Sequence, residues 1–280
     1  MRVLIAGCGY VGSRLGLLLA AAGAQVVGLA RRPGRLPEGV EPLAADLTNP
    51  TALGALPDGF DVVFHAASAD SRDPAAYERA YVRGVSNLIE RLASRQAPRR
   101  FFFVSSTGVY GQDRGEWVDE DSPTDPARFT ARALIEGERL ALSAPFPATV
   151  VRFGGIYGPG RTGLIDRVRA GRAHWRTGHY TNRIHRDDCA GALQHLAGLE
   201  APAQLYLGVD DEPTLERDVL VWLADRLGSE SPPVAAPGEG TRAGPGSKRC
   251  SNARLRAAGY RFRYPSFRQG YGDLLTPRGG

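Results

Sequence analysis

The sequence predicts an α/β fold, a doubly wound parallel sheet followed by a smaller C-terminal lobe. Three observations support this prediction. Short apolar runs alternate with helical patterns up to residue 153, a glycine motif joins the first run to the first helical pattern, and no internal repeat is present. Such alternation is typical of parallel strands joined by crossover helices. The 280 residues suffice for one large domain or two small ones and can bury a continuous core.

Six apolar runs of five or six residues predict buried strands, because each run is too short to form a helix. These runs are residues 2–6, 25–30, 40–44, 61–66, 100–105 and 148–153. Helical patterns occupy residues 10–22, 51–56, 74–95 and 127–143. Gly23 is a typical residue for ending the first of these helices, and Pro74 for starting the third.

The pattern becomes looser after residue 153 and indicates a smaller lobe. We expect helices at residues 164–170, 186–197, 215–227 and 252–258, and a strand at 204–208. The predicted domains are therefore residues 1–160 and residues 161–280, with the second partly interleaved with the first. Residues 228–249 are rich in Gly, Pro and Ser, which predicts either a solvated loop or a lid.

Composition excludes several classes of protein. With 42% hydrophobic and 23% charged residues and no apolar run of about 18 residues, we expect neither a membrane span nor a disordered chain. The first apolar stretch is too short for a secretory signal, so we expect a cytoplasmic protein. Cys8, Cys189 and Cys250 are odd in number, lie far apart in sequence and form no Cys-x-x-Cys, so we expect neither a disulfide framework nor a cysteine zinc site. The net charge of +5 comes from basic residues scattered along the chain, so we expect no nucleic-acid partner.

The glycine motif spans residues 7–12, Gly-Cys-Gly-Tyr-Val-Gly, directly after the first predicted strand. In this context Gly7 permits a tight turn, Gly9 lets the backbone approach a pyrophosphate, and Gly12 lets the helix pack on the strand. The free N–H groups of Tyr10, Val11 and the rest of the first turn can then bind phosphate. The alternative is a tight turn that binds no ligand.

Basic residues follow the second predicted strand, where a carboxylate would select NAD. Here the strand runs into Arg31 and Arg32, which could pair with a 2′-phosphate and so favour NADP over NAD. A solvated arginine pair is the alternative.

The residues after the third and fourth strands are also placed for the cofactor. Asp46 and Leu47 are expected to border the adenine, and residues 66–68 to pass beneath the ribose and phosphates. These last three residues are Ala66, Ala67 and Ser68. We interpret His65, just before them, as a satisfied core histidine rather than as an acid.

Six segments combine into a larger pattern. They are the glycine motif, Asp46-Leu47, His-Ala-Ala-Ser at 65–68, Val-Ser-Ser-Thr-Gly-Val-Tyr-Gly at 104–111, Arg-Phe-Gly-Gly-Ile-Tyr-Gly-Pro-Gly-Arg at 152–161 and Asn-Arg-Ile-His-Arg-Asp-Asp at 182–188. Together they resemble the extended short-chain dehydrogenase/reductase superfamily, of the NAD-dependent epimerase/dehydratase type. The segments 209–213 and 248–252 look most like an atypical bacterial branch of that family.

This resemblance implies a Rossmann-type NAD(P)-binding domain with a small substrate lobe, acting on nucleotide sugars or other secondary alcohols and ketones. In such enzymes a Tyr-x-x-x-Lys pair and a Ser or Thr carry the chemistry. Ser106 matches the serine position. We also expect Ser105, Gly154 and Ile156 to contact the cofactor.

The Tyr-x-x-x-Lys pair is absent. Of 35 basic residues only Lys248 is a lysine, and Gly244 stands four residues before it. Phe129 stands where the tyrosine would be, and Arg132 lies near the lysine position. Phenylalanine cannot transfer a proton, whereas Arg132 could hold the nicotinamide ribose or a substrate anion without acting as a base.

Three residues are candidates to replace the missing tyrosine. Tyr110 and Tyr157 follow predicted strands, and a nearby guanidinium could lower the pKa of either phenol. Packing in the wall of the site is the alternative for both. His185 could contact the substrate or could cap the helix that begins at residue 186.

Two functions remain open from the sequence. One is an NADP-dependent oxidoreductase or epimerase-like enzyme, and the other is a non-catalytic NADP-binding redox sensor or scaffold protein. For the enzyme we expect a small-molecule substrate with an anionic group and, by family analogy, a homodimer formed by the helices at 74–95 and 127–143. The expected substrate contacts are Arg161, Trp175, Asn182, Arg183 and His185.

Overall fold

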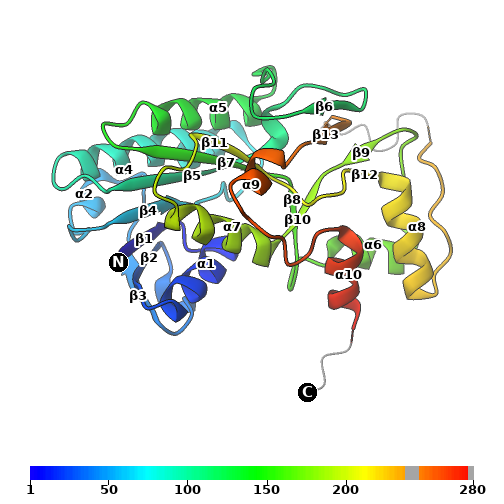
Figure 1. Ribbon diagram of the computed structural model, residues 1–280, viewed down its shortest axis with the longest axis horizontal. Coiled ribbons are helices and arrows are strands. Elements are labelled where there is room, and N and C mark those ends of the chain that lie inside the picture. The colour runs from blue at the N-terminus through cyan, green and yellow to red at the C-terminus, as the bar shows by residue number, and fades with distance from the viewer. Residues whose placement is uncertain (237–245, 277–280) are drawn as a thin grey trace.

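Seven parallel strands form the central sheet of the computed structural model, which describes residues 1–236 and 246–276 (Figure 1). Their order across the sheet is β11-β7-β5-β4-β1-β2-β3. The strands are β1 Arg2–Ala6, β2 Gln25–Ala30, β3 Val40–Ala44, β4 Val62–His65, β5 Arg100–Ser106, β7 Ala148–Phe153 and β11 Leu205–Gly208. The doubly wound α/β fold predicted from the sequence is confirmed.

The seventh strand corrects the sequence-based assignment. The run at 204–208 was attributed to the smaller lobe, but β11 pairs with β7 and completes the central sheet. Tyr206 and Leu207 are buried there, one on each side of the strand. The chain therefore returns to the sheet after leaving it, and periodicity alone could not reveal this because the two paired strands are far apart in sequence.

Helices cover both faces of the sheet (Figure 1). On one face α1 Tyr10–Ala21 packs against α7 Arg186–Gly198. The other face carries the remaining helices that precede β7 in the chain. They are α2 Pro50–Leu53, α3 Pro74–Glu78, α4 Gly84–Ala93 and α5 Phe129–Leu142.

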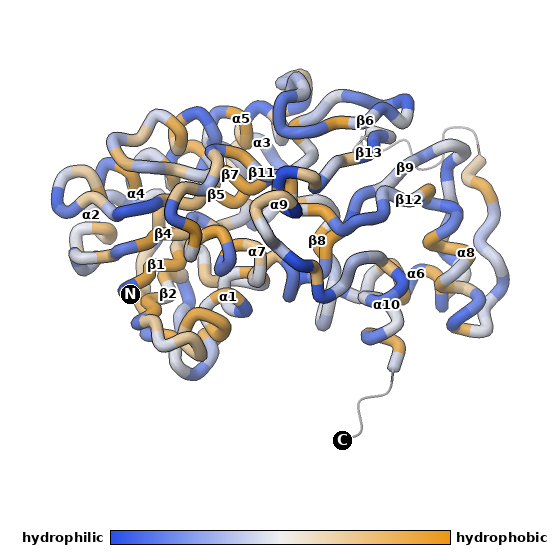
Figure 2. Tube along the Cα trace, viewed as in Figure 1, coloured by the Kyte–Doolittle hydropathy of each residue, from blue (hydrophilic) through white to orange (hydrophobic). Residues whose placement is uncertain are grey.

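Alternating side chains of the strands build a core on each face. In β1, Val3 and Ile5 join the core beneath α1 and α7, whereas Leu4 and Ala6 join the core beneath α4 and α5. All four residues are fully buried. Strands covered on both faces need apolar residues at every position, and Figure 2 shows the apolar residues concentrated in these strands.

The helix expected at 74–95 is interrupted. The π-helical turn η2 Arg79–Arg83 separates α3 from α4. Gly137 of α5 packs directly on this turn, since a Cβ there would lie 2.3 Å from the Tyr81 carbonyl oxygen. Wide turns of this kind are frequent at functional sites.

The C-terminal part adds short strand pairs and a helical cluster. The pairs join strands that are distant in sequence, and they are β8 Gly155–Tyr157 with β10 Arg183–His185, β9 Tyr180–Thr181 with β12 Thr214–Leu215, and β6 Glu116–Val118 with β13 Lys248–Cys250. The helices are α6 Gly163–Arg169, α8 Glu216–Leu227, α9 Ala253–Ala257 and α10 Phe267–Leu275. Three of these, α6, α8 and α10, share one apolar core with Tyr157.

Two further expectations are the absence of a membrane span and a loop or lid at residues 228–249. Among the described residues, no helix is long and apolar enough to cross a membrane. The lid or loop expected at 228–249 includes residues 237–245, which lie outside the described residues. The proposed domain boundary at residue 160 stays a prediction.

Candidate active site

A cavity of about 470 Å³ opens at the carboxyl ends of the central strands. We call it the glycine cleft. Its lining includes Gly7, Gly9, Tyr10, Val11, Arg31, Asp46, Leu47, Tyr81, Ala66, Ala67, Ser68, Ser105, Ser106, Gly154, Ile156 and Arg161. Ligands of doubly wound sheets bind at this edge.

The three glycines of the motif differ in what surrounds them. Gly7 has φ +90°, and a Cβ there would lie 2.2 Å from the backbone nitrogen of Ala67. A Cβ on Gly12 would lie 2.9 Å from the Ile5 side chain and 2.8 Å from the Gly7 carbonyl oxygen. Gly9 has open space where a side chain would be. Gly7 and Gly12 are therefore required by close packing, while Gly9 leaves its backbone open to the cleft.

The start of α1 suits a phosphate. In the described part of the chain no side chain caps the first turn of α1, and that turn contains no acidic residue. Its N–H groups and the positive end of the helix dipole are thus available to an anion. The residues present fit a dinucleotide with its pyrophosphate beside Gly9.

Of the two arginines expected at the cofactor, Arg31 and Arg32, only Arg31 belongs to the described lining of the cleft. Arg31 lines the cleft and donates hydrogen bonds of 2.7 and 2.5 Å to the two carboxylate oxygens of Asp70. This interaction lowers the pKa of Asp70. Arg32 is exposed and is not among the described residues that line the cleft. Only one of the two guanidiniums is thus placed to meet a bound ligand.

His65 is a core residue, but it is not satisfied as expected. It is fully buried at the end of β4 and stacks on Phe103, with 5.4 Å between ring centroids. Neither ring nitrogen has a hydrogen-bond partner among the described residues. Burial lowers its pKa to about 4, so the ring is neutral near pH 7.

A second cavity, of about 590 Å³, lies between the sheet edge and the C-terminal part. We call it the arginine cavity. Its lining includes Arg72, Tyr77, Tyr81, Ser106, Thr107, Arg128, Gly154, Ile156, Tyr157, Arg161, Arg167, His179, Asn182, Arg183, Glu216 and Lys248. Ser106, Gly154, Ile156 and Arg161 line both cavities, so the cavities meet at these residues.

Ser106 lies at this junction, at the end of β5. Its Oγ accepts a hydrogen bond of 3.0 Å from the Gly108 backbone N–H. The hydroxyl hydrogen therefore stays available for an acceptor in the cavity.

Neither tyrosine candidate has the expected lowered pKa. Tyr110 lines neither cavity, and its hydroxyl donates to the Asp119 carbonyl oxygen at 2.6 Å and accepts from Arg152 at 2.8 Å. Burial raises its pKa to about 12 despite the guanidinium. Tyr110 is therefore a buried core residue outside the described lining of both cavities, and its geometry does not support a catalytic role.

Tyr157 lines the arginine cavity, but its hydroxyl group is not placed for proton transfer. A Cβ at Gly270 of α10 would lie 1.8 Å from that hydroxyl, so the phenol end is packed against the helix backbone. Its ring lies 4.4 Å from that of Tyr271. Burial raises the pKa of Tyr157, which contradicts the expected activation and supports wall packing.

Arg132 does not take the position expected from the sequence. Its side chain is exposed on α5 and is absent from the described lining of both cavities. Arg128, just before α5, lines the arginine cavity instead and donates a 3.0 Å hydrogen bond to the Gly108 carbonyl oxygen. The backbone of Arg128 is extended, whereas Arg132 lies one turn into the helix on its outer side. The exact start of α5 decides which arginine faces the site.

Only some of the residues expected to contact the substrate line the arginine cavity. Arg161, Asn182 and Arg183 line the arginine cavity. Trp175 does not belong to the described lining, and its indole N–H donates to the Pro232 carbonyl oxygen at 2.9 Å. This hydrogen bond holds the indole against the segment that contains Pro232, outside the described lining of the cavity.

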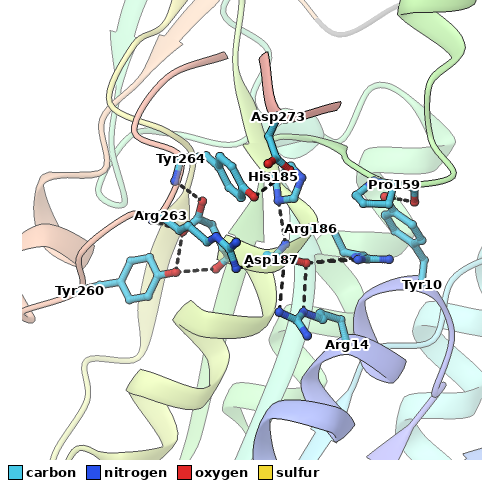
Figure 3. Close-up of polar contacts among 11 residues, drawn as sticks. Tyr10, Arg14, Pro159, His185, Arg186, Asp187, Tyr260, Arg263, Tyr264 and Asp273 are labelled. Carbon is cyan, nitrogen blue, oxygen red and sulfur yellow. Dashed lines mark hydrogen bonds and ion pairs between the residues drawn. The ribbon is translucent and has the colours of Figure 1, made fainter. Parts of the chain in front are cut away.

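His185 caps α7 instead of contacting a cavity (Figure 3). Its Nδ1 accepts a hydrogen bond of 3.2 Å from the Asp187 backbone N–H. It is 1% exposed, and burial lowers its pKa to about 4. The capping alternative is confirmed, and His185 is not among the described residues that line either cavity.

Polar contacts join α1 to the C-terminal half of the chain at Tyr10, which lines the glycine cleft (Figure 3). Asp187 accepts a 3.0 Å hydrogen bond from Arg14 of α1, and Tyr10 donates a 3.0 Å hydrogen bond to the Pro159 carbonyl oxygen. The Arg161 guanidinium stacks over the Tyr10 ring at 4.0 Å from its centroid.

Comparison with known proteins assigns the chain to a family. The model of the NAD-dependent epimerase/dehydratase family matches residues 3–186. The chain belongs to this family. Members of the epimerase/dehydratase family bind NAD or NADP.

Individual relatives cover most of the chain. A 3-diazoavenalumate denitrifying reductase from Streptomyces is 34% identical over 256 residues, 83% of each chain. A solved epimerase/dehydratase-type structure from Methylobacillus flagellatus has a TM-score of 0.81 at 38% identity and covers 98% of this chain and 97% of its own. A human epimerase family protein solved with NADPH has a TM-score of 0.81 at 21% identity, and the match covers 98% of this chain and 99% of the human chain, which shows the shared fold.

Sequence reasoning missed three features of this family member's site. Arg128 and Lys248 line the arginine cavity, and η2 brings Tyr81 to both cavities. One signal was present in the sequence, since Lys248 is the single lysine among 35 basic residues. Its position depends on the pairing of β13 with the distant β6, which no local pattern encodes.

Proposed function

We propose that the protein is an NADP-dependent oxidoreductase or epimerase-like enzyme. Its substrate would be a secondary alcohol or ketone with an anionic group, in a nucleotide sugar or in a smaller molecule. The observation that carries this proposal is the meeting of the glycine cleft and the arginine cavity at Ser106. The reductase named among the relatives supports redox chemistry for this site.

The residues divide into binding and chemical roles. A nicotinamide cofactor, when bound, would supply or accept a hydride. The start of α1 would hold its pyrophosphate, with Arg31 at the ribose. Ser106 would donate its free hydroxyl hydrogen to the substrate oxygen as negative charge grows there.

The arginine cavity favours an anionic substrate by its charge. Six of its described lining side chains are basic: Arg72, Arg128, Arg161, Arg167, Arg183 and Lys248. The one carboxylate in that lining, Glu216, accepts hydrogen bonds of 3.0 and 3.1 Å from Arg176. The cavity thus has an excess of positive charge, which attracts a carboxylate or phosphate.

Replacing Ser106 tests the enzyme proposal. In Ser106→Ala we expect kcat for NADPH-dependent carbonyl reduction to fall about 100-fold, because one donor to the developing charge is lost. Ser94→Ala, an exposed serine at the end of α4, is the matched control and should keep the wild-type rate. Unchanged turnover in Ser106→Ala would remove Ser106 from the mechanism.

The alternative function is a non-catalytic NADP-binding sensor or scaffold. It is favoured by the raised pKa of Tyr110 and Tyr157 and by Phe129 at the expected tyrosine position. A sensor would bind NADPH in a fluorescence titration and oxidise none of it with a broad panel of carbonyl compounds. An enzyme would do both.

We also propose a cytoplasmic location and a homodimer. Cys8, Cys189 and Cys250 are all buried free thiols, as is usual in a reducing compartment. The dimer rests on family analogy through the face of α4 and α5. Cell fractionation tests the first proposal, and sedimentation of the purified protein tests the second.

A further inference from the structure

The chain's only lysine lies in the wall of the arginine cavity. Lys248 begins β13, which pairs in parallel with β6 so that Lys248 is opposite Glu116. Its side chain is 1% exposed, yet it belongs to the cavity lining. Lysine is almost never this buried unless its charge is paired. Its placement therefore needs an explanation.

The described residues do not pair this charge. Within residues 1–236 and 246–276, no hydrogen bond or ion pair reaches the Lys248 ammonium. The backbone oxygen of Lys248 accepts a 2.9 Å hydrogen bond from Asn182, and Asn182 also accepts from the Cys250 N–H at 2.7 Å. These two bonds hold the backbone of β13 from Lys248 to Cys250 against Asn182, another residue of the cavity lining.

The surroundings of Lys248 favour its neutral form. Burial is the main cause that lowers the pKa of Lys248, the Cys250 thiol group opposes this shift, and the nearby Arg128 guanidinium adds to it. His179, whose own pKa is also lowered by burial, faces the same cavity. The remaining charged groups of the described lining are Arg72, Arg161, Arg167, Arg183 and Glu216. An amine that gives up its proton readily is suited to general acid catalysis.

We propose that Lys248 contacts the substrate and donates the proton that the reduced oxygen requires, in place of the missing Tyr-x-x-x-Lys pair. This inference rests on the proposed function. The carbonyl carbon gains a hydride from the reduced nicotinamide, and the electron pair of the breaking C=O π bond moves to the oxygen. That oxygen takes a proton from the Lys248 ammonium as the N–H bond breaks. The neutral amine then regains a proton from water, and the nicotinamide leaves oxidised.

A direct readout exists because the chain has one lysine. Protein grown with lysine labelled at Cε and Nζ gives a single side-chain resonance. We expect its titration midpoint to lie below 10.5, the ordinary lysine pKa, and the resonance to shift when pyruvate is added to the NADPH complex. Acetone, which lacks the carboxylate, should shift it less. A midpoint at 10.5 with no response to pyruvate would overturn the contact.

Kinetics test the proton transfer. In Lys248→Met we expect kcat to fall about 100-fold with a smaller change in KM, because methionine keeps the packing and removes the acid. The wild-type rate should fall as pH rises through the Lys248 pKa, and this alkaline limb should be absent from Lys248→Met. Cys250 and Tyr157 do not explain such a limb, since the pKa of Cys250 is raised to about 12 and that of Tyr157 is raised as well.

The control is the next residue on the same strand. Arg249→Met also removes one positive charge, but Arg249 donates to the Gly115 carbonyl oxygen and is absent from the described lining of the cavity. It should keep the wild-type kcat. If Lys248→Met folds and keeps kcat within threefold with an unchanged pH profile, the Lys248 proposal fails while the enzyme proposal stands. If the wild type reduces no carbonyl, the enzyme proposal fails and the NMR titration still tests the contact.

Discussion

Arg31 meets Asp70 at the glycine cleft, and this ion pair bears on which dinucleotide binds. Both side chains are more than half exposed, at 60% and 56%. An exposed ion pair contributes little to stability. A 2′-phosphate could therefore displace Asp70 from Arg31 at small cost and gain charge-assisted hydrogen bonds in return.

Two arginine variants test the NADP preference. In Arg31→Ala we expect the Kd for NADPH to rise about tenfold, which is about 1.4 kcal/mol, while the Kd for NADH changes little. Arg32→Ala is the matched control, since Arg32 is exposed and outside the described lining of the cleft. Fluorescence titration measures both constants. Equal affinity of the wild type for NADPH and NADH would contradict the preference.

Most residues expected at the cofactor line the glycine cleft, whereas the sequence could not place single side chains in the catalytic region. Glycines and strand ends are local features, so Gly7, Asp46 and Ser106 follow from motif and spacing. The positions of Arg132 and Tyr110 depend on where α5 begins and on contacts with distant strands. Those contacts are not local, which is why the sequence did not show that both side chains lie outside the described lining of the cavities.

Helix α5 carries two ion pairs that differ in burial. Glu138 binds Arg152 of β7 through hydrogen bonds of 2.9 and 2.6 Å, and it also accepts a 2.6 Å hydrogen bond from Ser105. Both charged partners are less than 10% exposed. Glu136 and Arg139 form the second pair, on the exposed side of the same helix.

Removing one buried partner should cost far more than removing an exposed one. In Glu138→Gln we expect the free energy of unfolding to fall by about 3 kcal/mol, because Arg152 is left as a buried, poorly compensated charge. Glu136→Gln should barely move the urea midpoint. Urea denaturation of both variants makes the comparison. A similar midpoint for the two variants would show that the buried pair does not hold α5 on the sheet.

The strands of the central sheet and most helices were predictable, whereas the short strands outside that sheet were not. The six predicted sheet strands and the helices at the positions of α1, α5, α7 and α8 follow from apolar runs and helical periodicity. Strands such as β9 and β12 have two residues each, too few for a pattern, and they form because distant segments meet. The interrupted helix at η2 also depends on a distant contact, the packing of Gly137 on Tyr81.

The fold as a whole brings residues from the two halves of the chain to neighbouring cavities. The N-terminal half supplies the glycine cleft with its phosphate-binding turn, and the C-terminal half completes the arginine cavity with Arg183 and Lys248. The contacts of Asp187 with Arg14 and of Tyr10 with Pro159 hold the halves together beside the junction. The proposed chemistry needs both cavities to open onto the same point.

A crystal structure of the protein with NADPH bound tests this arrangement most directly. We predict the pyrophosphate at the start of α1, the 2′-phosphate at Arg31, and the nicotinamide ring beside Ser106 with its reactive face toward the arginine cavity. A nicotinamide ring that lies away from Ser106, or that is separated from the arginine cavity by apolar side chains, would contradict a shared active site.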